Sequence, residues 1–345
     1  MHAAIFRGPK DIIVGERPDP VLQEPTDAVV RVVLACVCGS DLWYYRGESP
    51  HAVGSIGHEL IGVVEDLGRE VTGIAEGDLV VAPFICSDMS CPRCPHGSTI
   101  DCAAGGTFGN GTTDGGQGEA VRVPLAGSTR VPVPGSGHSG DVLRSLLTLS
   151  DVMSTGHHAA VSVGVKCGDT VAVVGDGAVG LSAVLASKRL GADRIIALSR
   201  HAERQRVAKE FGATDIVEAR GDEAAETVLE LTGGVGVDDA LECVGTQQSI
   251  ETAAAIARPG STIGVVGVPH GAVPFNQTFF RNIGWRGGPA PARIYIPELL
   301  DDVLHGTINP GLVLDFETDL DGTPEAYATM DERRAIKSLI RVGSL

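Results

Sequence analysis

One short stretch decides the fold of this chain: residues 170–180 read TVAVVGDGAVG. An apolar run ends at Val174, the glycines Gly175, Gly177 and Gly180 follow in a G-x-G-x-x-G pattern, and a helical pattern continues to about Leu190. In such a strand–turn–helix the first glycine permits the tight turn and the second lets a pyrophosphate approach the backbone, while the third allows close packing of helix on strand. Amide groups at the helix start then face the phosphates. We therefore predict that Gly175, Gly177 and Gly180 bind a dinucleotide.

The sequence around this loop alternates apolar strands with amphipathic helices. Such an alternation predicts an α/β fold, a doubly wound parallel sheet covered by helices on both faces. The first third of the chain instead reads as short strands between glycine and proline turns, which indicates a second, mainly β domain. The predicted strands are 28–34, 62–67, 78–83, 171–174, 194–198, 239–244, 262–266 and 338–342; helical spacing is expected over 142–163, 179–190, 202–211 and 297–304.

The end of the second strand of this α/β segment indicates which dinucleotide binds. An NAD site of this type carries an acidic residue there, about 20 residues after the glycines, to bind the ribose 2′-hydroxyl. Here Ser199 and Arg200 stand at that point, and Asp193 lies at the wrong end of the strand. A serine hydroxyl and a guanidinium suit a 2′-phosphate. The sequence therefore predicts a preference for NADP over NAD.

Composition narrows the class of protein. The 345 residues suggest two domains, and the 27 basic against 44 acidic side chains leave a net charge of −17, which disfavours nucleic acid or an anionic membrane as partner. The start of the chain lacks a secretory signal pattern, and the most apolar stretch, 170–187, is interrupted by Asp176 and glycines. We therefore expect a cytoplasmic protein whose 8 cysteines are reduced and available for metal binding.

Three clustered cysteines predict one metal site. Cys91, Cys94 and Cys102, with Asp88 three residues before the first, read D-x₂-C-x₂-C-x₇-C. Four such donors on one tight lobe suit a closed, tetrahedral structural zinc site. Cys86 competes with Asp88 as the fourth ligand, although its spacing to Cys91 is longer.

A second set of metal-binding residue types is spread along the chain. Cys38 opens the stretch CGSD, His58 and Glu59 follow Gly57, and Asp151 is expected on the helix before the α/β segment. A catalytic zinc uses three protein ligands and keeps one position open for substrate. Spacing alone does not show that Cys38 and His58 converge, nor does it select Asp151 among the carboxylates.

These residues together resemble the zinc-dependent alcohol dehydrogenases of the medium-chain dehydrogenase/reductase superfamily. The likeness runs nearly end to end: Cys38-Gly39-Ser40-Asp41, then Gly57-His58-Glu59-x-x-Gly62 with Gly68, the cysteine lobe, Asp151 with Thr155-Gly156, and the glycine loop at 175–180. The resemblance implies a GroES-like catalytic domain from residues 1–147 and 286–345, with the structural-zinc lobe at about 86–103, and a Rossmann-fold cofactor domain from residues 148–285.

The resemblance also implies roles for single residues. Cys38, His58 and Asp151 would bind catalytic zinc, with Glu59 as an occasional ligand. Asp41 would orient His58 by a hydrogen bond. Ser40 would accept the alcohol proton first. Two further residues would contact the cofactor: Thr155 at the nicotinamide end and Lys337 near the phosphates.

The chain departs from the family in three places. Aspartate stands at Asp151, where many relatives have cysteine, and Asp88 replaces the usual first cysteine of the lobe. Trp43 stands where many relatives have a proton-relay histidine, so the proton must leave by another route, and its bulk suggests an apolar substrate.

The hypothesis from sequence is an NADP-preferring zinc alcohol dehydrogenase acting on a small or medium alcohol and its aldehyde or ketone. A polyol or sugar dehydrogenase on the same scaffold is the nearest alternative. A zinc-free quinone or enone reductase is less favoured, because it has no use for three metal ligands. The resemblance further implies a homodimer or homotetramer assembled through the cofactor domain.

Overall fold

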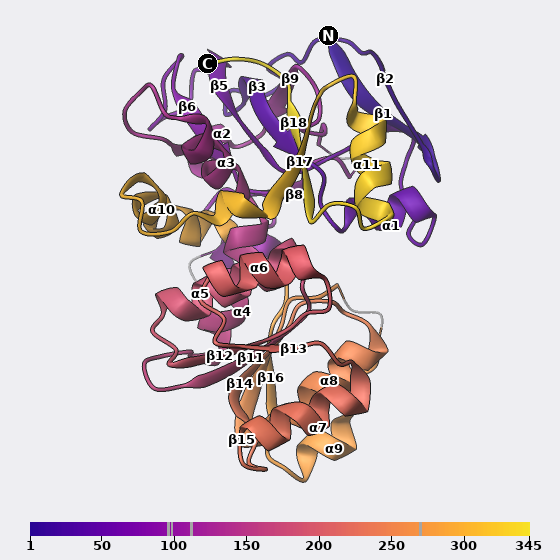
Figure 1. The fold of residues 1–345 in the computed structure, drawn as a ribbon. Coiled ribbons are helices and arrows are strands. Elements are labelled where there is room, and N and C mark those ends of the chain that lie inside the picture. Colours follow the sequence, from indigo (N-terminus) through magenta and orange to yellow (C-terminus); the bar gives the residue numbers. More distant parts are fainter. Residues whose placement is uncertain (95–96, 98, 111–112, 269–270) are drawn as a thin grey trace. The chain divides into compact units, whose positions relative to one another are not determined.

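The computed structural model describes residues 1–94, 97, 99–110, 113–268 and 271–345, and it divides into two compact units. The first unit comprises Met1–Asp151 and Pro291–Leu345, and the second comprises Val152–Ala290. These boundaries lie a few residues from those expected, and both chain ends belong to the first unit (Figure 1). Within the described residues, no helix has the length and apolarity needed to span a membrane.

The second unit is built on a parallel six-stranded sheet. Its strand order is β13-β12-β11-β14-β15-β16, with all neighbouring strands parallel. The strands β12 and β13 lie on one side of β11 and β14 to β16 lie on the other, so the strand order reverses at β11. In open α/β sheets, ligands bind beyond the carboxyl ends of the strands at such a reversal. The strands are β11 (Thr170–Val174), β12 (Arg194–Leu198), β13 (Asp215–Val217), β14 (Val237–Glu242), β15 (Ala257–Val265) and β16 (Gly284–Gly287).

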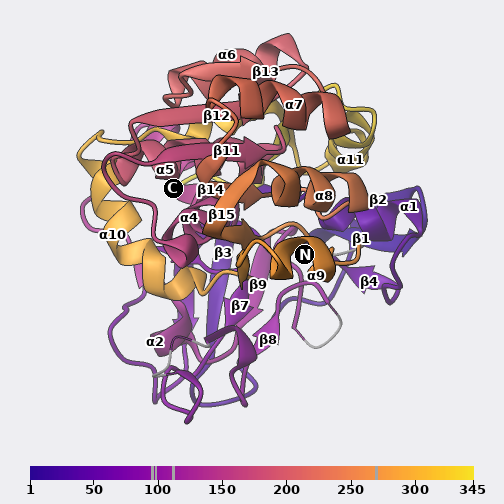
Figure 2. The ribbon, with the colours of Figure 1, turned by 90° about the horizontal axis from the view of Figure 1, so that it is seen from below.

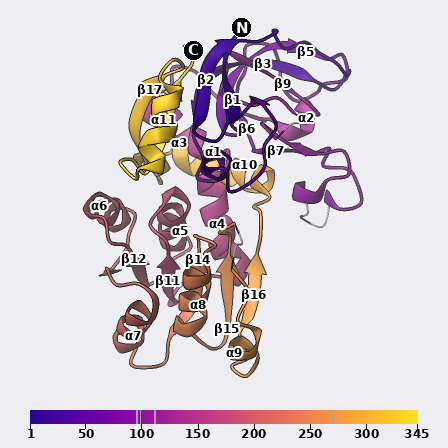
Figure 3. The ribbon, with the colours of Figure 1, turned by 90° about the vertical axis from the view of Figure 1, so that its right-hand side faces the viewer.

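Helices cover both faces of this sheet, as the continuous apolar strands predict. One layer holds α4, α5 and α6, and the other holds α7 and α8 (Figure 3); α7 and α8 pack side by side (Figure 2). The apolar core between sheet and helices includes Ile196, Ala240 and Ala253, all fully buried. The helices are α4 (Val152–Val163), α5 (Ala178–Arg189), α6 (Ala202–Glu210), α7 (Gly221–Leu231), α8 (Gln247–Ile256) and α9 (Phe275–Phe279).

The first unit is mainly β, and its largest sheet joins the two ends of the chain. The order is β10-β6-β5-β3-β18-β17, with β9 also pairing with β3. The last strand, β18 (Lys337–Arg341), runs antiparallel to β3 (Ala28–Cys36), with Leu339 opposite Cys36. The other strands are β1 (His2–Gly8), β2 (Asp11–Glu16), β4 (Gly54–Ser55), β5 (Leu60–Leu67), β6 (Leu79–Ala82), β7 (Ile85–Cys86), β8 (Gly106–Thr107), β9 (Ala120–Val123), β10 (Val131–Pro132) and β17 (Leu314–Asp319).

Short helices connect these strands and close the core. Tyr327 on α11 is fully buried in it, beside apolar residues of β3 and β5 such as Val30 and Leu60. The helices of this unit are α1 (Asp41–Arg46), α2 (Ala126–Thr129), α3 (Gly140–Thr148), α10 (Ala292–Leu304) and α11 (Thr323–Asp331), with 3₁₀ turns η2 (Thr99–Asp101) and η3 (Pro310–Val313).

Two helix predictions differ from the structure. The helical spacing over 142–163 belongs to two helices, α3 and α4, and Asp151 lies in the turn between them rather than on a helix. Helix α10 begins at Ala292 and runs through Pro297, which was expected near its start. A proline there removes one backbone hydrogen bond, to the carbonyl of Arg293.

Candidate active site and metal centres

Cys38 is positioned by the end of strand β3 and the start of helix α1. The chain leaves β3 at Cys36, and the amide of Val37 still donates to the carbonyl of Ser338, at 3.1 Å. The amide of Cys38 then donates to Oδ2 of Asp41, at 3.0 Å. Strand pairing and this turn together fix the Cys38 side chain, which is buried.

His58 and Glu59 lie directly before strand β5. Gly57 has a positive φ of 87°, and a Cβ there would come within 2.5 Å of the Gln117 side chain, so the turn into His58 requires glycine. Nδ1 of His58 lies 3.3 Å from Oδ1 of Asp41. This contact turns the other ring nitrogen, Nε2, towards Asp151, which is the orienting role predicted for Asp41.

Asp151 brings the third donor from the turn between α3 and α4. Its Oδ2 lies 3.2 Å from Nε2 of His58 and 3.5 Å from Sγ of Cys38. One ligand atom each from Cys38, His58, Glu59 and Asp151 falls within 4.8 Å of the others. Ligands about 2.0 to 2.3 Å from a shared tetrahedral zinc would be separated by about 3.3 to 3.8 Å. The residue types are those that bind zinc, and the two distances from Asp151 agree with this spacing.

Glu59 supplies a further sign that this group fits a cation. Its Oε1 accepts from Nζ of Lys337, at 2.6 Å, but its Oε2 is buried and has no hydrogen-bond partner among the described residues. An unpaired buried carboxylate oxygen is costly, and a nearby metal ion would satisfy it. Burial raises the pKa of the Cys38 thiol, and the charges of Asp151 and Glu59 raise it further. A divalent cation would offset both effects and favour the thiolate, which is the form that binds metal.

Lys337, predicted to contact the cofactor phosphates, lies beside the first donor group. The Lys337 side chain is completely buried, and its ammonium donates to Glu59 and, at 3.0 Å, to the carbonyl of Val37. Burial alone lowers the pKa of Lys337, but its anionic neighbours, Glu59 among them, raise it well above the usual value. Lys337 is therefore a buried cation paired with Glu59, and sequence position did not reveal this pairing.

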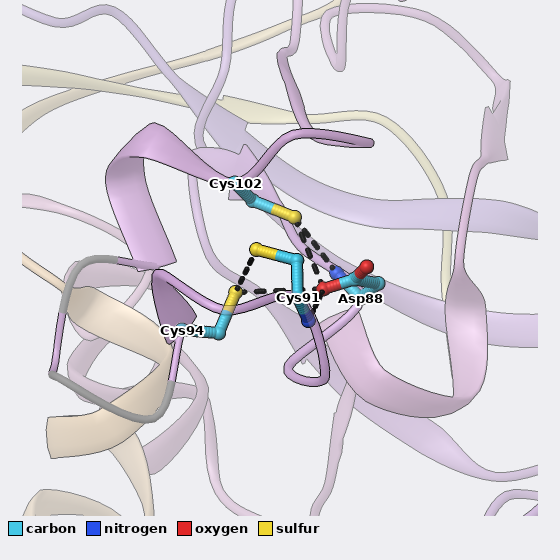
Figure 4. A group of neighbouring side chains, drawn as sticks. All are labelled: Asp88, Cys91, Cys94 and Cys102. Carbon is cyan, nitrogen blue, oxygen red and sulfur yellow. Dashed lines mark hydrogen bonds between the residues drawn. The ribbon is translucent and has the colours of Figure 1, made fainter.

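The predicted zinc lobe forms a second group of four donors (Figure 4). Oδ1 of Asp88 lies 3.4 Å from Sγ of Cys94 and 3.2 Å from Sγ of Cys102. The sulfurs of Cys91 and Cys94 are 3.4 Å apart. Because one ligand atom from each residue lies within 4.8 Å of the others, the four side chains could hold one ion.

Backbone amides favour the ionised forms of this lobe. Amides of Ala103, Arg93 and Cys94 lower the pKa of Cys91 to about 7. Those of Cys91 and Ser90 hold the pKa of Asp88 well below its usual range. Among the described residues, Asp88 is the fourth member of the group.

The competing ligand Cys86 lies in β7 and is buried. Burial raises the pKa of its thiol to about 12, which disfavours it as a metal-binding thiolate.

The glycine loop has the geometry that its sequence predicts. Gly175 has a φ of 121°, which L-residues rarely adopt, and it leads from β11 into the loop. A Cβ on Gly180 would meet the carbonyl oxygen of Gly175 at 2.0 Å, so the helix α5 can approach the strand only with glycine there. A Cβ on Gly177 would meet no atom of the described residues within 4 Å, which leaves open space among them beside the first turn of α5.

The end of strand β12 lies beside a carboxylate that was not expected there from the sequence. Oδ2 of Asp176, from the glycine loop, accepts from the Ser199 hydroxyl at 3.0 Å and from the Arg200 amide at 3.3 Å. Nη1 of Arg204 on α6 lies 3.1 Å from Oδ1 of Asp176. Asp176 occupies a variable position of the glycine pattern, so the pattern does not predict a contact between Asp176 and Ser199.

Three remaining predicted residues lie on or beside helices α1 and α4. Ser40 is half-buried at the N-cap of α1, two residues after Cys38. Trp43 is half-buried on the same helix. Thr155 is buried on α4 in the second unit.

Comparison with known proteins gives consistent results over most of the chain. The family model "Alcohol dehydrogenase GroES-like domain" matches residues 24–134, and "Zinc-binding dehydrogenase" matches residues 178–302. A "Probable zinc-binding alcohol dehydrogenase" of Mycobacterium tuberculosis is 34% identical over 96% of this chain and 86% of its own length. "Zinc-type alcohol dehydrogenase B" of Aspergillus flavus is 31% identical over 99% of this chain and 82% of its own. The solved alcohol dehydrogenase TADH of Thermus sp. ATN1 superimposes with a TM-score of 0.91 at 33% identity, covering 99% and 100% of the two chains.

Proposed function

Because the chain belongs to the zinc-type alcohol dehydrogenases of the medium-chain dehydrogenase/reductase superfamily, we propose that it transfers a hydride between an alcohol and a nicotinamide dinucleotide. The substrates are a small or medium alcohol and, in reverse, its aldehyde or ketone. The observation that carries the proposal is the convergence of Cys38, His58 and Asp151, with Glu59 beside them, on one point.

The residues of the donor group divide the work between them. A zinc ion bound there supplies Lewis-acid polarisation of the substrate oxygen. Asp41 fixes the ring of His58 so that Nε2 faces the group. Lys337 holds Glu59 and balances part of the negative charge. Ser40 takes up the hydroxyl proton of the alcohol first and passes it to water or the cofactor ribose, since Trp43 cannot relay it.

The cofactor belongs at the glycine loop of the second unit. Gly177 leaves room for the pyrophosphate, and the start of α5 offers it amide groups. Thr155 contacts the nicotinamide end in this proposal. Arg200 is exposed beside Ser199 at the end of β12, which supports a preference for NADP over NAD.

The lobe of Asp88, Cys91, Cys94 and Cys102 completes the proposal with a second, structural zinc ion. We further propose a homodimer or homotetramer in the cytoplasm, a reducing compartment that suits the eight free cysteines.

Metal analysis and a cofactor-coupled activity screen test this function together. The purified protein is expected to contain two zinc ions per chain and to reduce aldehydes or ketones, with sugars and enones screened as competing substrates. Cys38→Ser should lose one zinc ion and at least about 100-fold in kcat/KM, because the group then lacks its thiolate. Cys167→Ser, which changes an exposed cysteine, is the matched control. A Cys38→Ser protein that keeps both zinc and activity would refute the proposed site.

A further inference from the structure

The carboxylate of Asp176 lies where the ribose 2′-position of a bound dinucleotide is expected. In this fold the residue at the end of the second strand contacts the ribose 2′-group, and here that residue is Ser199, directly after β12. The Ser199 hydroxyl is 3.0 Å from Oδ2 of Asp176, and its residue is 2% exposed. The glycine loop thus places a carboxylate at the end of β12, where the strand itself has no acidic residue.

This carboxylate engages the groups that would otherwise bind a 2′-phosphate. The Ser199 hydroxyl donates to it, and Arg204 forms an ion pair with it at 3.1 Å, with both side chains largely buried (14% and 13% exposed). The Arg200 amide also donates to it, at 3.3 Å. A 2′-phosphate would have to displace a negative charge from these donors, whereas a 2′-hydroxyl could donate to that charge.

The carboxylate is ionised in this setting. Burial raises the pKa of Asp176, but the Arg204 charge and the hydrogen bonds from Ser199 and Arg200 lower it more, so the pKa lies below its usual value. A like charge held this close to a phosphate weakens binding strongly in a partly buried site.

We infer that Asp176 weakens the preference for NADP over NAD that Ser199 and Arg200 favour: it repels the 2′-phosphate, accepts a hydrogen bond from the 2′-hydroxyl, and is balanced by Arg204. The inference deepens the proposed function and rests on it, because it takes the glycine loop as the dinucleotide site. It assigns the choice of cofactor to an ion pair rather than to Ser199 and Arg200 alone.

Binding of two adenosine fragments to the full-length protein isolates this effect from catalysis. Adenosine 2′,5′-bisphosphate carries the 2′-phosphate and 5′-AMP lacks it, and calorimetry gives a Kd for each. Asp176→Asn keeps an acceptor for Ser199 but removes the charge, so it should shift the ratio of the two Kd values towards the bisphosphate by about tenfold or more. The ratio of kcat/KM for NADP over NAD should shift in the same direction.

A second variant should move the ratio the other way. Arg204→Gln leaves the Asp176 charge unbalanced and is expected to weaken the bisphosphate about tenfold relative to 5′-AMP. Glu203→Gln is the matched control on α6, because Glu203 pairs with Arg206 at the surface; its ratio should stay within twofold of the parent. Asp176→Ser replaces Asp176→Asn if a thermal melt shows that the asparagine protein does not fold.

The outcomes separate the two hypotheses. If the parent binds both fragments and the ratio of a folded Asp176 variant stays within twofold of it, Asp176 does not set the choice and only the inference fails. If the parent binds neither fragment nor either dinucleotide, both the inference and the proposed function are overturned.

Discussion

At the scale of single residues, the buried pair of Lys337 and Glu59 joins the C-terminal strand to the first donor group. The Lys337 ammonium forms an ion pair with Glu59, and its phosphate contact stays a prediction. The two side chains are 1% and 0% exposed. Breaking such a pair leaves one buried charge without a partner, which costs more than the pair itself contributes.

Replacing Lys337 by methionine should therefore destabilise the zinc-loaded protein by about 3 kcal/mol or more, measured by denaturant unfolding. The double variant Lys337→Met/Glu59→Gln removes both charges and should recover most of that loss. Lys10→Met is the control, because Lys10 pairs with Asp331 at the surface and should cost under about 1 kcal/mol. Equal losses in the single and double variants would show that the pair is not coupled.

At the scale of secondary-structure elements, the starts of strands β11 and β14 bring two carboxyl groups together. Asp239 on β14 and Asp169, directly before β11, are both buried. Burial raises the pKa of Asp239 to about 7, and the charge and hydrogen bond of Asp169 add to the effect. Lys166 pairs with Asp169 at 3.1 Å, which leaves Asp239 as the group that takes up the proton.

The raised pKa of Asp239 fixes the sign of its effect on stability. The folded chain binds this proton more tightly than the unfolded chain. The stabilisation from protonated Asp239 is therefore complete below about pH 4 and is lost as the pH rises through about 7. Asp239→Asn should therefore increase the free energy of unfolding at pH 8 by about 1 kcal/mol and much less at pH 5. Urea unfolding at the two pH values measures this.

The neighbouring Asp238 provides a control of opposite sign. It accepts from the Thr170 amide at 2.9 Å and from Arg258 at 2.8 Å. Burial raises the pKa of Asp238, but these partners lower it overall, so its carboxylate stabilises the fold at neutral pH. Asp238→Asn should lose stability at pH 8. A gain for Asp238→Asn, or a pH-independent effect of Asp239→Asn, would contradict this assignment.

At the scale of the whole molecule, the two units differ in how the chain builds them. The second unit is one continuous segment, Val152–Ala290, whose sheet needs no strand from elsewhere. The first unit needs both chain ends, because β18 lies between β3 and β17 in its large sheet. Contacts between such distant segments form only after a long loop has closed.

This difference predicts how the two pieces behave when expressed alone. Residues 152–290 should fold, unfold cooperatively on heating and bind 5′-AMP, because sheet, helices and glycine loop all lie within the segment. Residues 1–151 should not unfold cooperatively, since β3 then exposes an unpaired edge. Circular dichroism melts and fragment calorimetry test both. A stable, cooperative 1–151 fragment would show that β18 is dispensable.

The sequence alone determined the chemistry that is local along the chain. The glycine loop, the strands and helices around it and the spacing of Asp88, Cys91, Cys94 and Cys102 are short-range patterns, so backbone geometry and ligand type could be inferred from them. The thiol and imidazole of the second donor group could be proposed in the same way.

Beyond what the family resemblance implied for Asp151 and Glu59, only the tertiary structure decided which carboxylates and cations meet. Asp151 contacts Cys38 across 113 positions, and Lys337 contacts Val37 across 300. Even Asp176, only 23 positions from Ser199, reaches it because β11 and β12 are adjacent parallel strands. Strand pairing brings these residues together, and a short-range sequence pattern does not predict which strands pair.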